Sequence, residues 1–90
     1  MSLLAELTAK AEAAAVRIYS DAVADGHEET PEACLDFWRD WGEDQADWAV
    51  DFLTTDERAR VEAAFLAAAR QAMARRRCHR VIARRRGVYA

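Results

Sequence analysis

The chain has 90 residues, with 21 alanines, three glycines and one proline, and its net charge is −3. This composition favours an all-α fold, because alanine is the best helix former and glycine and proline are the worst. Two cysteines, Cys34 and Cys78, make no disulfide framework, and no apolar run approaches the roughly 20 residues of a membrane span. We therefore expect a cytoplasmic chain without signal peptide or membrane contact, whose two thiols are reduced and buried.

The two signs of charge are separated along the chain. All 16 acidic residues lie at or before Glu62, so residues 1–62 carry a net charge of −11, whereas residues 63–90 carry +8 from eight arginines. Such a separation indicates either a charged partner or a charged tail. Arginine outnumbers lysine twelve to one, which fits either bidentate recognition of phosphate and carboxylate or the codon usage of a GC-rich genome.

The first predicted helix runs from about residue 2 to residue 24. Ser2 is a good N-cap, and Gly26 is the residue type that commonly follows a helix C-terminus. Apolar residues recur at steps of three or four between these signals, as expected for one face of an amphipathic helix. This face comprises Leu4, Leu7, Ala11, Ala14, Ile18 and Ala22.

The second predicted helix spans about residues 31–53. Thr30 as N-cap and Pro31 as the first helical residue give its start. Gly42 lies within it, but the helical phase of the apolar residues is the same before and after this glycine, which favours one helix with a bend there. The shared apolar face comprises Cys34, Phe37, Trp38, Trp41, Gln45, Trp48, Ala49 and Phe52.

The third predicted helix begins with a capping box, in which Thr54 and Glu57 satisfy each other's backbone N–H groups. Its apolar stripe comprises Val61, Phe65, Ala68, Ala69, Ala72 and Met73. Arg76 falls on the same stripe, and the following apolar residues lie on roughly the opposite face. The helix therefore either kinks or ends near residues 74–77, or its last turns leave the core. We predict a single domain of residues 1–90, an all-α three-helix antiparallel bundle with helices at about 2–24, 31–53 and 55–75 and a basic helical extension at 76–86.

Six carboxylates follow one another on the second helix at steps of three or four residues, opposite its apolar face. They are Glu32, Asp36, Asp40, Glu43, Asp47 and Asp51. Their spacing of about 5–6 Å along the helix is comparable to that of phosphates along a nucleic-acid strand. Only Arg39 offers a positive charge between residues 32 and 53. This acidic face is either an ordinary solvated face or a surface that binds a basic protein partner.

The aromatic residues of the second helix have the spacing of core residues. Phe37 and Trp48 lie at the edge of the apolar face, so either could anchor a partner by entering its pocket.

The basic tail is the third feature. It comprises Arg75, Arg76, Arg77, Arg80, Arg84, Arg85 and Arg86. Four readings stay open: contact with a nucleic-acid backbone, an anionic membrane surface, the acidic face of this chain or of a second copy in a homodimer, or a solvated helix end. The membrane is the weakest, because the apolar strip between the arginines contains no Trp, Phe or Leu.

Residues typical of catalysis or metal binding do not form a motif. The two histidines, His27 and His79, have no zinc-ligand spacing with each other or with the cysteines, and no glycine-rich phosphate loop is present. We expect no enzyme activity, metal or cofactor. The leading hypothesis is a small non-enzymatic interaction protein whose acidic face binds a basic surface, such as a phage-encoded inhibitor or regulator of a nucleic-acid-handling complex. The alternative is a nucleic-acid-binding protein that acts through the basic tail.

Overall fold

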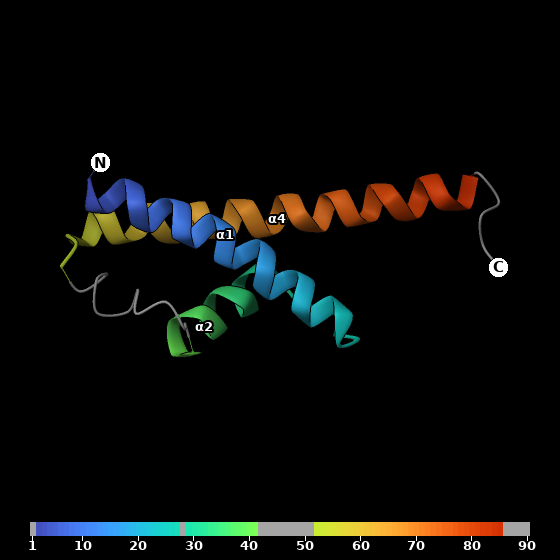
Figure 1. Ribbon diagram of the computed structural model, residues 1–90, viewed down its shortest axis with the longest axis horizontal. Helices are drawn as coiled ribbons and strands as arrows, with labels where there is room; N and C mark the ends of the chain where they lie inside the picture. Colours follow the sequence, from blue (N-terminus) through green and yellow to red (C-terminus); the bar gives the residue numbers. More distant parts are fainter. Residues whose placement is uncertain (1, 28, 42–51, 86–90) are drawn as a thin grey trace.

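The computed structural model describes residues 2–27, 29–41 and 52–85 of the chain. In these ranges it contains three helices and no strand: α1 (Leu3–Ala24), α2 (Pro31–Trp41) and α4 (Thr55–Arg85). The all-α prediction is confirmed. In Figure 1, α1 and α4 run in the same general direction. The segment between them in the sequence, α2, runs in roughly the opposite direction. No described helix combines the length and apolar character needed to cross a bilayer.

The helix starts are fixed by side chains that the sequence identifies. Ser2 Oγ accepts a hydrogen bond from the Ala5 N–H at 3.1 Å, and Thr30 Oγ1 accepts one from Ala33 N–H at 3.1 Å. These contacts satisfy amide groups that have no partner within the first helical turn. The predicted N-caps of α1 and α2 are confirmed.

The capping box of α4 is confirmed in both directions. Glu57 N–H donates to Thr54 Oγ1 at 3.1 Å, and Thr54 N–H donates to Glu57 Oε1 at 3.0 Å. Two amides that would otherwise lack a partner are therefore satisfied at the point where α4 begins.

α1 ends at Ala24 with Asp25 as its C-cap, and the next residue, Gly26, has a φ angle of +86°. The His27 N–H donates to the Ala22 carbonyl and the Gly26 N–H to the Val23 carbonyl, at 2.8 and 3.0 Å. These two bonds define a Schellman motif, which requires a left-handed residue at the position that glycine occupies. The chain thereby turns within a few residues from α1 into α2.

The core lies where the three helices meet, and α4 packs mainly against α1. Trp38 of α2 stacks on Phe65 of α4 with ring centroids 5.2 Å apart and an angle of 22° between the ring planes. Alanines on α1 let α4 approach closely. The buried residues are Leu7, Ala11, Ala14, Ala15, Tyr19, Cys34, Leu35, Trp38, Val61, Phe65 and Ala69.

Three predictions require correction. The second helix does not continue to Leu53, because Phe52 and Leu53 lie in a turn and a bend before Thr54; residues 42–51, with Gly42, lie outside the described residues. Phe52 is 71% exposed and is no core residue. Cys78 is exposed rather than buried, whereas Cys34 is buried as expected.

The third helix does not end or break near residue 75. α4 is one helix of 31 residues, about 46 Å long at a rise of about 1.5 Å per residue. Its packing against α1 ends near Arg76, which is half-buried, and Arg77 and Cys78 are exposed. Figure 1 shows the last turns of α4 continuing past the end of α1, with no other described helix beside them. The sequence left open whether the helix kinks, ends near residues 74–77 or leaves the core. In the structure its last turns leave the core.

Candidate protein-binding surface

The acidic face of α2 is described over its first three carboxylates. Glu32, Asp36 and Asp40 are all exposed, as the helical spacing predicts. The remaining predicted members, Glu43, Asp47 and Asp51, and the candidate anchor Trp48 lie outside the described residues.

Two of these carboxylates form ion pairs within the chain. Glu32 Oε1 accepts a hydrogen bond from Arg70 Nη2 of α4 at 3.2 Å, and Asp36 Oδ1 accepts one from Arg39 Nη1 at 3.2 Å. All four side chains are about half exposed or more, so each pair is worth about 0–1 kcal/mol at most and can exchange for a partner's cation at little cost. Arg39 and Arg70 therefore offset part of the negative charge of the acidic face, more than the sequence indicates.

A stronger contact joins Arg39 of α2 to Glu62 of α4. Arg39 donates through Nε to Glu62 Oε2 at 2.8 Å and through Nη2 to Glu62 Oε1 at 2.6 Å. The hydrogen bond from Arg39 lowers the pKa of Glu62 below its ordinary value, and the same bond raises the pKa of Arg39. This two-point contact constrains the orientation of α2 against α4, together with the stacking of Trp38 on Phe65.

Phe37 lies on the exposed side of α2 and is 53% exposed. Core packing, the more common role for an aromatic at helical spacing, applies to Trp38 but not to this residue. The prediction that Phe37 lies at the edge of the apolar face agrees with this exposure, while its role as an anchor remains a prediction.

Beside Phe37 is a pocket of about 430 Å³ between the end of α1 and the start of α2. Its apolar lining comes from Ile18, Ala22, Ala33, Cys34 and Phe37. Its polar lining comes from Asp21, Asp25, His27 and Glu29. We call this feature the acid-rimmed pocket. Among its described lining residues there is neither Arg nor Lys.

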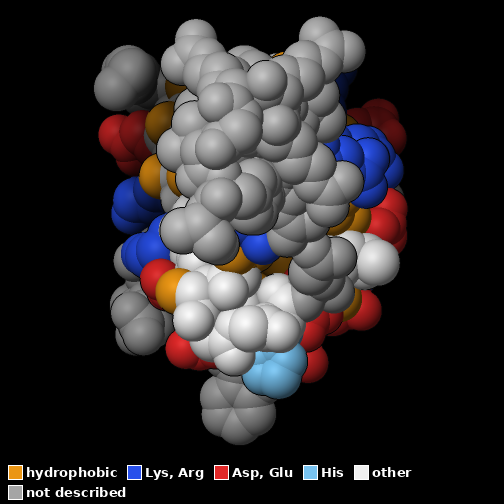
Figure 2. Space-filling view, turned by 90° about the vertical axis from the view of Figure 1, so that its right-hand side faces the viewer, with side chains coloured by type: hydrophobic (Ala, Val, Ile, Leu, Met, Phe, Trp, Pro, Cys, Tyr) orange, Lys and Arg blue, Asp and Glu red, His pale blue; other side chains and the backbone are white. Residues whose placement is uncertain are grey.

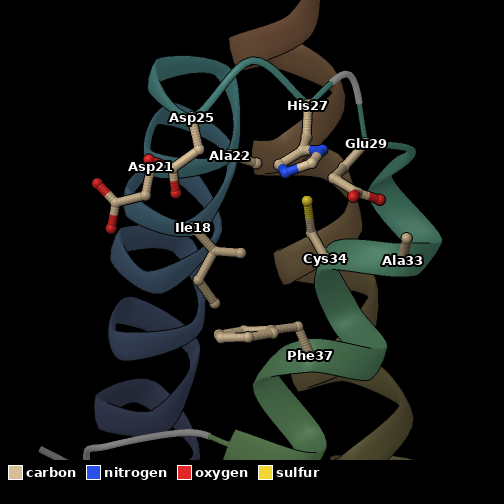
Figure 3. Close-up of a pocket in the computed structure, with 9 residues that line it drawn as sticks. All are labelled: Ile18, Asp21, Ala22, Asp25, His27, Glu29, Ala33, Cys34 and Phe37. Atoms are coloured by element: carbon tan, nitrogen blue, oxygen red, sulfur yellow. The ribbon is translucent and has the colours of Figure 1, made fainter.

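Figure 3 shows how the acid-rimmed pocket is built. Asp21 and Asp25 are on the α1 side, and Glu29 is on the α2 side. The sulfur of Cys34 points into the space beneath His27. Figure 2, a view from the end toward which α4 points, shows acidic side chains on this part of the surface beside a histidine.

Cys34 is not poised for nucleophilic chemistry. Its side chain is 1% exposed, and burial raises the pKa of its thiol, with a further increase from the Glu29 carboxylate. A thiol that resists ionisation is a poor nucleophile. No cluster of three His, Cys, Asp or Glu side chains suited to hold a metal ion occurs in the described part of the chain.

The basic tail is described in part. Arg75 and Arg77 are exposed and Arg76 is half-buried, as its place on the core stripe predicts. Arg80, Arg84 and Arg85 belong to the helical part of α4, and Arg86 lies outside the described residues. Because α4 continues away from α2 in Figure 1, the tail as far as Arg85 does not fold back onto the described acidic face of its own chain. The contact between the two charge regions is made upstream of the tail, by Arg70 and Glu32.

The acid-rimmed pocket and the role of Glu62 were not predicted from the sequence. The short turn at Gly26 was a usable signal for the pocket, since it places the last turn of α1 beside the first turn of α2. Leu35 was also missed as a core residue, because it falls next to Arg39 on the helical wheel. Comparisons of the chain with models of protein families, with curated proteins and with solved structures gave no match.

Proposed function

We propose that this chain is a non-enzymatic interaction protein that binds a basic surface of a protein partner through the exposed face of α2. In this proposal the architecture is an antiparallel three-helix bundle that presents α2 to the partner. The observation that carries the proposal is the half-exposed Phe37 between two exposed carboxylates, Asp36 and Asp40, beside the acid-rimmed pocket.

An exposed aromatic on the same helix as exposed carboxylates suits a particular kind of partner. The aromatic ring contributes binding energy when a partner pocket removes it from water, and the carboxylates orient the encounter with a positively charged surface. Proteins that bind nucleic acid carry such a surface, because lysine and arginine side chains neutralise the phosphates. A small inhibitor or regulator of a nucleic-acid-handling complex is therefore the concrete form of the proposal.

The test uses the immobilised full-length chain and a nuclease-treated lysate of its host. The variant is Asp36→Lys with Asp40→Lys, and the matched control is Glu6→Lys with Glu12→Lys, which makes the same charge change on α1. We expect a protein retained by the native chain and the control, lost with the α2 variant, and displaced by a DNA oligonucleotide. Equal retention by the native chain and the α2 variant, with unchanged far-UV circular dichroism, would overturn the proposal.

A second candidate function is sequence-independent nucleic-acid binding by the end of α4. The observation that favours it is the continuation of α4 to Arg85 beyond the end of α1, with Arg75 and Arg77 exposed. Each phosphate contact contributes about 0.9 to the slope of log K against log salt concentration for duplex DNA. We expect a chain that ends at Arg76 to bind DNA more weakly and with a smaller slope. Identical salt titrations for the truncated and full-length chains would eliminate this function.

A further inference from the structure

Two features of the described structure have complementary charge but cannot meet within one chain. The first is the acid-rimmed pocket, with its apolar lining and the carboxylates of Asp21, Asp25 and Glu29. The second is the segment of α4 at residues 77–85, which we call the arm. Figure 1 shows that the arm is part of one continuous helix that leads away from α1 and α2.

The arm has the composition of a helix that needs a partner. Its nine residues include four arginines and no acidic residue, together with Val81 and Ile82. No other described helix lies beside the arm in Figure 1, so the arm lacks, within the described part of one chain, the tertiary packing that stabilises most protein helices. An acidic apolar surface would both cover its apolar residues and oppose its charges.

We propose that the arm of one copy docks at the acid-rimmed pocket of a second copy. The pocket's volume of about 430 Å³ lies within the range of about 300–1,000 Å³ in which proteins hold small ligands, so it can accept one or two side chains of the arm. The three carboxylates at its rim oppose the arm's four arginines. Ile18 and Phe37 in the pocket offer apolar contact to Val81 and Ile82. Reciprocal docking closes a twofold dimer.

This inference extends the proposed function, because Phe37 belongs to both surfaces, but it depends on different carboxylates. The partner-binding proposal uses Asp36 and Asp40 on the exposed face of α2. Self-association uses Asp21 and Asp25 on α1, which can be reversed without changing the α2 carboxylates. The two proposals can therefore fail separately.

The test is sedimentation velocity before and after nuclease treatment, with the native chain and two variants. One variant ends at Arg76 and so keeps the pocket but lacks the arm. The other carries Asp21→Lys and Asp25→Lys, and so keeps the arm but has a reversed rim; lysines near the C-terminus of α1 are favourable to the helix dipole, so folding should persist. Far-UV circular dichroism checks that both variants are folded.

We expect the native chain to sediment with about twice the mass of one copy at about 50 mM salt and to dissociate at about 500 mM salt, where screening is stronger. Each variant alone should be monomeric. An equimolar mixture should form a heterodimer, because the truncated chain supplies the pocket and the charge-reversed chain supplies the arm. The Glu6→Lys, Glu12→Lys control should dimerise like the native chain.

Four outcomes would overturn the inference: a native chain that is monomeric at low salt, a truncated chain that still dimerises alone, folded variants that do not associate when mixed, or an association that nuclease removes. The last would assign the arm to nucleic acid. The Asp36→Lys, Asp40→Lys variant should still self-associate while it loses the heterologous partner. Partner binding without self-association would refute only this inference. Self-association without partner binding would refute only the proposed function.

Discussion

Arg39 on α2 donates hydrogen bonds to both carboxylate oxygens of Glu62 on α4, with N–O distances of 2.8 and 2.6 Å. The two residues are 23 positions apart, and Trp38 and Phe65 join the same two helices by ring stacking. A planar guanidinium that meets a carboxylate at two points fixes orientation as well as distance. The pair therefore adds to the buried aromatic contact in orienting α2, and with it the acidic face, against α4.

Replacing Glu62 by Gln should lower the free energy of unfolding at neutral pH by about 0.5–1 kcal/mol, the range for a partly exposed ion pair. The pKa of Glu62 is lower in the folded state than its ordinary value of 4.5, so folding favours the charged carboxylate. Its contribution is complete above the unfolded-state pKa and is lost as pH falls through the folded-state pKa.

Urea denaturation at pH 7 and again below the folded-state pKa of Glu62 checks this prediction. The native chain and the Glu62→Gln variant should differ at pH 7 and converge at the acidic pH. The matched control is Asp36→Asn, which removes a single, more exposed contact with Arg39 and should cost less. A difference that grows toward low pH would contradict the assignment.

Replacing Phe65 by Ala should cost about 3–5 kcal/mol, because its fully buried ring stacks on Trp38 and the change leaves a cavity. A chain of 90 residues has a stability of only about 5–15 kcal/mol, so this single change removes a large part of it. Thermal unfolding followed by circular dichroism measures the loss. Phe37→Ala, at a half-exposed ring on α2, should cost far less; equal costs would mean that Phe37 is buried in solution.

Replacing Gly26 by Ala should destabilise the chain by about 1–2 kcal/mol, because its φ of +86° lies in the left-handed region that a Cβ disfavours. No atom lies within 4 Å of where that Cβ would be, so the cost comes from the backbone conformation alone. Gly26→Asn should cost less, since Asn tolerates this conformation best after glycine. Urea denaturation of the three chains checks the order, and an alanine variant as stable as the native chain would contradict it.

The two thiols should react at different rates with a soluble aromatic disulfide reagent. Cys78 is exposed, whereas Cys34 is buried and its pKa is raised, so Cys78 should react at least about tenfold faster. Cys78→Ser should remove the fast phase and Cys34→Ser the slow one. In urea the two thiols should react alike. A native chain in which both react in a single fast phase would show that the pocket opens readily.

Local signals in the sequence were sufficient to place the helix ends. Ser2, Thr30 and Thr54 cap amides three residues ahead, and Gly26 closes the Schellman motif, so each end depends only on neighbouring residues. The apolar periodicity also identified most of the core, because burial follows the helical repeat. It failed at Phe52, which lies in a turn before α4 and is 71% exposed.

The sequence by itself determined an all-α chain, its caps and the separation of acidic from basic residues. Only the tertiary structure decided which of those charges meet. The Arg39–Glu62 and Arg70–Glu32 pairs, the acid-rimmed pocket and the exposure of Arg77 and Cys78 all depend on how α1, α2 and α4 cross and where α1 stops beside α4. That geometry follows from close packing between residues far apart in the chain, and helical periodicity does not encode it.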